Sequence, residues 1–137
     1  MSVPEGKRRA GKMQVFVKAQ ELACYTVQIV SNEKVFPPNF RRTLTDDLVQ
    51  LAKDIFASAW AANSIRAADA ESASARRTLQ SEAIEKCTRL QALIRVAHKV
   101  FHLSTKRAIF WDGQVQEVRS LLVAWRASDR ERYKNLG

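Results

Sequence analysis

Apolar residues in this chain recur at steps of three and four positions, in four runs separated by short polar or proline-containing segments. These steps place side chains on one face of an α-helix. We therefore predict helices over residues 13–31, 45–66, 75–103 and 104–128. The positions predicted to face a common core are Val15, Ala19, Leu22, Thr26 and Ile29; Leu48, Leu51, Ile55, Ala59 and Ala62; Leu79, Ala83, Cys87, Leu90, Ile94, Ala97 and Phe101; and Ala108, Trp111, Val115, Val118, Leu122 and Trp125.

The segment between the first two helices contains the clearest local signals. Pro37 and Pro38 stop any helix that approaches from the N-terminal side, because proline lacks an N–H and restricts the residue before it. Thr45 can then cap the second helix, and Asp46 and Asp47 suit the positive end of that helix. The sequence therefore predicts a helix start at Thr45.

Two other features bear on where the later helices begin. Residues 67–74 lack Gly and Pro, but a continuous helix would place Arg66 and Asp69 on the apolar face, so we predict a loop there with Ser72 or Ser74 as the next cap. Gly113 lies inside the last apolar run. It indicates either a close helix approach or a late helix start at Gln114.

Three apolar residues extend the third helix beyond its main stripe. Leu93, Val96 and Val100 form a second row, which we expect to widen the buried face. Trp60 falls off the stripe of the second helix and is surrounded by alanines. We expect it to be a core residue, with a subunit interface as the alternative.

Short links between successive helices favour antiparallel neighbours, so the predicted fold is all-α, an up-down-up-down four-helix bundle. We expect residues 1–12 to be a flexible basic tail, 13–128 the bundle, and 129–137 a frayed polar tail.

The composition of the 137 residues is that of a globular domain, with 46% hydrophobic and 27% charged residues. The formal net charge is +9. So large an excess for this size indicates an acidic partner, with nucleic acid ahead of an anionic membrane or an acidic protein.

Cys24 and Cys87 both fall on predicted apolar faces, where a free cysteine behaves as a small core residue. Two cysteines do not indicate a disulfide framework. No apolar run precedes Val15, and no uncharged run is long enough to cross a bilayer. We therefore expect a cytoplasmic protein with no membrane partner.

No set of residues in the sequence indicates catalysis. There is no glycine-rich phosphate loop, nucleophile elbow or zinc-protease motif. His98 and His102 have a metal-ligand spacing, but no third ligand is evident and neighbouring cations would repel a metal. Asp46 and Asp47 are explained by their place at a helix start. We expect a protein that is not an enzyme and has no cofactor or metal.

Basic residues recur at helical spacing on the last two helices and next to the proline segment. Rows of like charge repel each other, and an anionic partner would relieve that repulsion. The candidate nucleic-acid-binding residues are Arg41, Arg42, Arg95, Lys99, His102, Lys106, Arg107, Arg119 and Arg126.

The chain also resembles a known family over roughly residues 13–127. The resemblance is carried by the segments Lys18–Leu22, Phe36–Leu44, Ala61–Asn63, Leu90–Ala97 and Leu121–Trp125. These segments are similar to small bacterial four-helix proteins that include Avd, the accessory variability determinant of diversity-generating retroelements, and the proteins encoded in ribosomal RNA intervening sequences. The Avd branch usually has a Gly-Gly-Trp-like ending, whereas Val123-Ala124-Trp125 stands here.

That resemblance implies a homopentamer of four-helix protomers that binds a reverse transcriptase and its template RNA and has no catalytic site of its own. Only the Phe-Pro segment, Asn63 and the region of Trp125 map onto family motif positions, with structural roles. We therefore expect a non-enzymatic RNA- or DNA-binding accessory protein of a diversity-generating retroelement. The alternative is a basic protein-interaction module of the ribosomal intervening-sequence type.

Overall fold

Four long helices make up most of the chain: α1 (Glu5–Ser31), α2 (Asp46–Ser64), α3 (Ala70–Val100) and α4 (Thr105–Arg132). The computed structural model describes residues 5–136, with the side chains of residues 5–10 and 40–42 excluded. Short helical segments follow α1 and α4: η1 (Pro38–Phe40), η2 (Arg41–Thr45) and η3 (Lys134–Leu136). Within residues 5–136 there is no strand, so the fold is all-helical.

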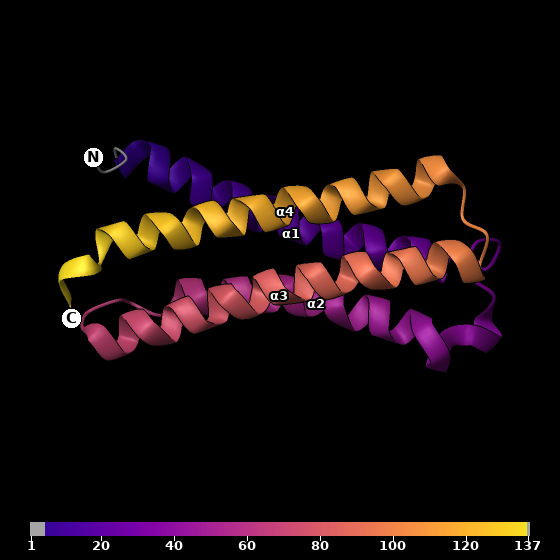
Figure 1. The fold of residues 1–137 in the computed structure, drawn as a ribbon, viewed down its shortest axis with the longest axis horizontal. Coiled ribbons are helices and arrows are strands. Elements are labelled where there is room, and N and C mark those ends of the chain that lie inside the picture. Colours follow the sequence, from indigo (N-terminus) through magenta and orange to yellow (C-terminus); the bar gives the residue numbers. More distant parts are fainter. Residues whose placement is uncertain (1–4, 137) are drawn as a thin grey trace.

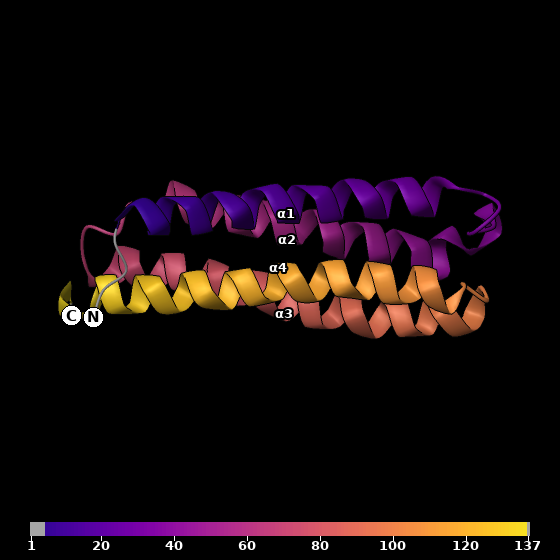
Figure 2. The ribbon, with the colours of Figure 1, turned by 90° about the horizontal axis from the view of Figure 1, so that it is seen from above.

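The four helices lie side by side as a bundle (Figure 1). α1 and α3 each pack against both α2 and α4. The α1–α2 and α3–α4 connections lie at one end of the bundle, and the α2–α3 connection lies at the other (Figures 1 and 2). The end of α4 is therefore brought beside the start of α3.

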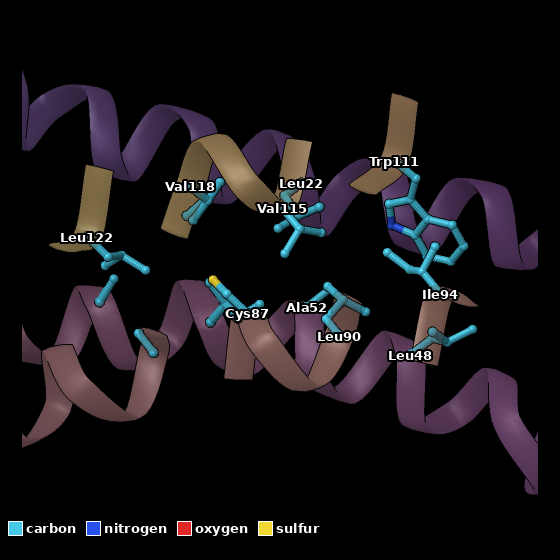
Figure 3. Close-up of a cluster of buried hydrophobic side chains, with 14 of the residues drawn as sticks. Leu22, Leu48, Ala52, Cys87, Leu90, Ile94, Trp111, Val115, Val118 and Leu122 are labelled. Carbon is cyan, nitrogen blue, oxygen red and sulfur yellow. The ribbon is translucent and has the colours of Figure 1, made fainter. Parts of the chain in front are cut away.

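The core lies between the helices and is built from the predicted stripes (Figure 3). All five predicted core positions of α1 and all six of α4 are buried. On α3, the five central positions from Ala83 to Ala97 are buried, whereas Leu79 and Phe101 at the ends are half-buried. On α2, Ala52 is buried and Leu51 is only half-buried, so the inner face is rotated slightly from the predicted stripe.

Aromatic rings close the end of the core nearest the α3–α4 turn. Trp111 is fully buried, and its indole Nε1–H donates to Thr26 Oγ1 at 3.0 Å. The ring of Phe36 packs edge-on against Phe101 and Trp111, with centroids 4.9 and 6.1 Å apart. Phe36 thus ties the proline-containing connection to the core.

The helix bounds differ from the predicted ones. α1 begins at Glu5, eight residues before Met13, so most of the segment expected to be a tail is helical. α4 continues through Arg132, and Asp129 is buried at 8% exposure where we expected a frayed tail to begin. Both helices are longer because apolar periodicity marks only the packed part of a helix, and polar turns can extend beyond it.

Two predicted caps were wrong. Thr45 does precede α2, but its backbone is already helical and its hydroxyl is buried without a partner. η2 runs directly into α2, so no turn is left for a side-chain cap. At α3 the cap is Asp69 rather than Ser72 or Ser74: Asp69 accepts from the Ser72 N–H, and Ser72 Oγ accepts from the Asp69 N–H.

The Asp69 cap makes stability depend on pH. The Ser72 N–H and hydroxyl donate to the Asp69 carboxylate and hold its pKa below the usual 3.8. A depressed pKa adds stability above the unfolded-state pKa, and this stability is lost as the pH falls through the folded-state value. The melting temperature of wild type should therefore exceed that of Asp69→Asn at pH 7, and the gap should close towards pH 3. A gap that stays constant to pH 2 would contradict this assignment.

Several residues expected to be buried are exposed. Trp60 is 56% exposed and stacks on Phe56 at 5.7 Å, so it is not a core residue. In the second row of α3, Leu93 is half-buried and packs against the core, whereas Val96 and Val100 are 45% and 48% exposed, so the row widens the buried face only at Leu93. Cys24 is also exposed. Val96, Val100 and Cys24 lie on the outer sides of their helices, whereas Trp60 lies at the edge of the bundle, where its ring packs edge-on against Phe16 of α1 at 5.6 Å.

Gly113 lies well inside α4, which begins at Thr105, so a late helix start does not explain it. A Cβ added there meets no atom within 4 Å, so a close helix approach does not explain it either. Gly113→Ala should therefore stabilise the protein by about 0.5–1 kcal/mol, because alanine loses less backbone entropy in a helix. Urea unfolding would measure this, with Ala124→Gly, at an exposed position of the same helix, expected to change stability in the opposite direction.

Candidate nucleic-acid interface

The positive charge is unevenly distributed among the helices. α3 contains six Lys or Arg residues against three Glu, and α4 contains six against four acidic residues. α2 contains three Asp and one Lys, so it is net negative. α1 contains five Lys or Arg residues against two Glu, so α1, α3 and α4 are all net positive. An anionic partner would therefore be attracted to the sides of the bundle away from α2.

Arg119 and Arg126 both reach from α4 to hydroxyl groups of α3. Arg119 Nε donates to Thr88 Oγ1 at 3.2 Å, and Arg126 Nη1 donates to Ser81 Oγ at 3.1 Å. Burial raises the pKa of the Cys87 thiol to about 12, and the nearby charge of Arg119 opposes that rise. Both guanidinium groups are thus held by neutral hydroxyl partners between α3 and α4.

The candidates Arg95, Lys99, His102, Lys106 and Arg107 lie at the other end of the same two helices, around the α3–α4 turn. All five are exposed. His102 has a φ of 53°, a left-handed conformation that ends α3. Ser104 then caps α4 by accepting from the Arg107 N–H.

Arg107 lies towards α1, away from the α3–α4 groove. Burial raises the pKa of the Tyr25 phenol on α1, and the charge of Arg107 counteracts that rise. Arg107 therefore belongs to the α1–α4 side of the turn, and the nine candidates do not share one face.

The side chains of Arg41 and Arg42 fall outside the described residues. Their backbone forms η2, at the same end of the bundle as the α3–α4 turn (Figure 1).

Most acidic residues of α3 and α4 already have basic partners. Glu85 pairs with Arg89 at 2.6 Å, Glu131 with Lys134 at 2.6 Å, and Glu117 of α4 lies 3.8 Å from Lys18 of α1. Arg95, Lys99, Arg77 and Arg130 have no acidic partner within the described part of the chain. These four side chains are free to bind phosphate groups.

A buried polar cluster joins the start of α3 to the end of α4. Arg76 Nε lies 2.5 Å from Asp129 Oδ2, and Gln80 Nε2 donates to the same oxygen at 2.8 Å. Arg76 Nη1 also donates to the Ile65 carbonyl, and its guanidinium lies over the Trp125 ring at 5.2 Å. This cluster fixes the geometry of the end of the bundle where Arg126 lies.

Three basic residues near that cluster were not among the nine candidates, although Arg130 shares a helical face with Arg119 and Arg126. Arg77, Arg130 and Lys134 line a pocket together with Arg126. Arg77 was close to the predicted start of the third helix, and residues after Ser128 were assigned to a tail. The sequence did contain a signal for Arg130, because residues four positions apart on a helix, such as Arg126 and Arg130, lie on the same face.

Two other features concern metals and membranes. Across the residues that the structure describes, no group of three or more His, Cys, Asp or Glu side chains could hold a metal ion. No helix of the described chain has the length and apolar character needed to span a membrane.

Comparison of the chain with protein-family models, with curated proteins and with solved structures finds no match. The resemblance to Avd-like proteins therefore rests on its motif residues. Phe36 and Trp125 are buried at 2% and 7% exposure, and Asn63 is half-buried near the end of α2. Of these positions, Phe36 and Trp125 belong to the hydrophobic core.

Proposed function

We propose that this protein is a non-enzymatic nucleic-acid-binding accessory protein whose contact surface is the α3–α4 face. The observation that carries the proposal is the set of arginines on these helices with neutral partners or none. Arg119 and Arg126 are held by hydroxyl groups, and Arg95 and Arg130 have no acidic partner among the described side chains. Arginine binds phosphate oxygens through paired N–H donors, and no feature for reading bases is evident. Binding is then independent of sequence.

The resemblance to Avd supplies the proposed partners: the reverse transcriptase of a diversity-generating retroelement and its template RNA. It also supplies the proposed assembly, an up-down-up-down protomer in a homopentamer. Connections at alternate ends of the bundle support that order of helices. Exposed large apolar side chains on several helices support subunit contacts, among them Met13, Trp60, Val100, Ile109 and Phe110.

Binding of a labelled single-stranded RNA, measured by fluorescence anisotropy over a range of salt concentrations, tests the nucleic-acid proposal. Each phosphate contact contributes about 0.7 to the slope of log affinity against log salt for a single strand. Replacing Arg95, Lys99 and Arg119 by Gln should lower affinity at every salt concentration and reduce the slope by about 2.

Lys53→Gln is the control, because Lys53 is an exposed cation on the net negative helix α2. We expect it to leave the slope unchanged. Wild type that fails to bind RNA or DNA at low salt would overturn the proposal, and salt-sensitive binding only to an acidic protein would favour a protein-interaction module. Light scattering tests the assembly: a mass near five protomers supports it, and a monomer contradicts it.

A further inference from the structure

Two adjoining pockets lie between the start of α3 and the end of α4, and the same three arginines line both. Their volumes are about 290 and 310 Å³. Arg77 comes from α3, and Arg126 and Arg130 come from α4. Lys134 completes the lining of the first pocket, and Ser81 that of the second. Both pockets lie at the end of the bundle opposite the α3–α4 turn.

The single side-chain carboxylate that lines the first pocket already accepts hydrogen bonds from buried partners. Asp129 accepts from Arg76 and from Gln80, and all three residues are buried. The charge of Asp129 is therefore balanced beneath the pocket. It does not neutralise the arginines at the pocket surface.

The pocket surface offers hydrogen-bond donors that lack acceptors. Arg77 and Arg130 have no hydrogen bond or ion pair with any described residue. Arg126 donates to Ser81 Oγ, which leaves the Ser81 hydroxyl hydrogen free to donate to a ligand. Several donors and three unneutralised charges thus converge from two helices whose relative position is fixed by the buried cluster.

We propose that this three-arginine pocket binds a phosphate monoester, and specifically the 5′-phosphate end of a nucleic-acid strand. A monoester carries about −1.5 to −2 charge at pH 7 and three acceptor oxygens, more than a phosphodiester within a strand offers. A pocket of about 290 Å³ is at the small end of ligand sites, which suits a terminal group. The choice of a strand as the source of the phosphate rests on the proposed function.

The test compares two RNA oligonucleotides of identical sequence, each labelled at the 3′ end, with a 5′-phosphate on one and a 5′-hydroxyl on the other. Wild type should bind the phosphorylated strand about tenfold more tightly, since hydrogen bonds between charged groups are among the strongest in proteins. The double variant Arg77→Gln, Arg130→Gln should bind the two strands within about twofold of each other. Both side chains are exposed, so the double variant is expected to fold as wild type does.

Arg95→Gln is the matched control. It makes the same Arg→Gln change at one exposed position of α3, and Arg95 lies outside both pockets. It should weaken binding of both strands and preserve the preference for the 5′-phosphate. Equal affinity of wild type for the two strands would overturn the strand-end proposal, as would a preference that survives in the double variant.

A second experiment distinguishes a strand end from a free phosphate monoester as the ligand of the pocket. Adenosine monophosphate is added to wild type and to the double variant, and the melting temperature is measured. A shift in wild type alone, without a preference between the two strands, assigns the pocket to a free monoester and overturns the strand end as its ligand. If adenosine monophosphate does not shift the melting temperature of wild type, and wild type binds the two strands equally, the proposal that the pocket binds a phosphate monoester is overturned. Failure of the proposed function is distinct, because the 5′-hydroxyl strand would then not bind to wild type at low salt.

Discussion

Asp129→Ala is expected to lower the free energy of unfolding by about 3–5 kcal/mol, because removing one partner of a buried ion pair leaves the other charge uncompensated. Arg76 is 6% exposed, and its Nε lies 2.5 Å from Asp129 Oδ2. Gln80, which is fully buried, loses its acceptor in the same variant. Urea unfolding followed by circular dichroism measures the loss.

An exposed ion pair on α3, the helix that contains Arg76, provides the control. Glu85 and Arg89 lie 2.6 Å apart with side chains that are 61% and 64% exposed. Glu85→Gln should change stability by less than about 1 kcal/mol, since water screens such pairs. If Asp129→Ala cost no more than Glu85→Gln, the cluster would not be stabilising the end of the bundle.

Trp111→Ala should destabilise the protein by about 3–5 kcal/mol, because it removes the largest fully buried side chain and leaves a cavity. It also removes the hydrogen bond to Thr26 and the contacts with the rings of Phe36 and Tyr25. Trp111→Phe retains most of the apolar contact and should cost less. The melting temperature and the urea midpoint both report the change.

Trp60 is the matched control for Trp111, since it is a tryptophan in a helix at 56% exposure. Trp60→Ala should have a much smaller effect on the stability of the protomer. A loss as large as that of Trp111→Ala would show that Trp60 is buried in solution, as a subunit interface requires.

The core could be predicted from the sequence because the period of 3.6 residues per turn fixes which side chains share a face. Leu22, Leu90 and Leu122 are all buried as that period requires. The same rule does not say how far a helix continues once its polar turns leave the core, so the starts of α1 and α3 were placed too late. Caps depend on backbone geometry that the sequence does not specify, as at Thr45.

Helical periodicity also made part of the candidate interface predictable. Helical spacing singled out Arg119 and Arg126, and the structure brings both against α3. Arg77 lies in the first turn of the predicted third helix, but Arg130 lies beyond the predicted end of the fourth, and the two meet because α4 continues through Arg132. A pocket between the ends of two helices depends on where each helix begins or ends. The apolar pattern of the sequence determines neither point.

The uneven charge of the helices gives the molecule one negative side and an opposite positive side. α2 is net negative, and α4 lies diagonally across the bundle from it, since each packs against α1 and α3. The protomer is therefore an electric dipole, and the field of an approaching polyanion exerts a torque on it before any contact forms. Such pre-alignment increases the fraction of collisions that meet α4 and the faces on either side of it, so added salt should slow association more than it accelerates release.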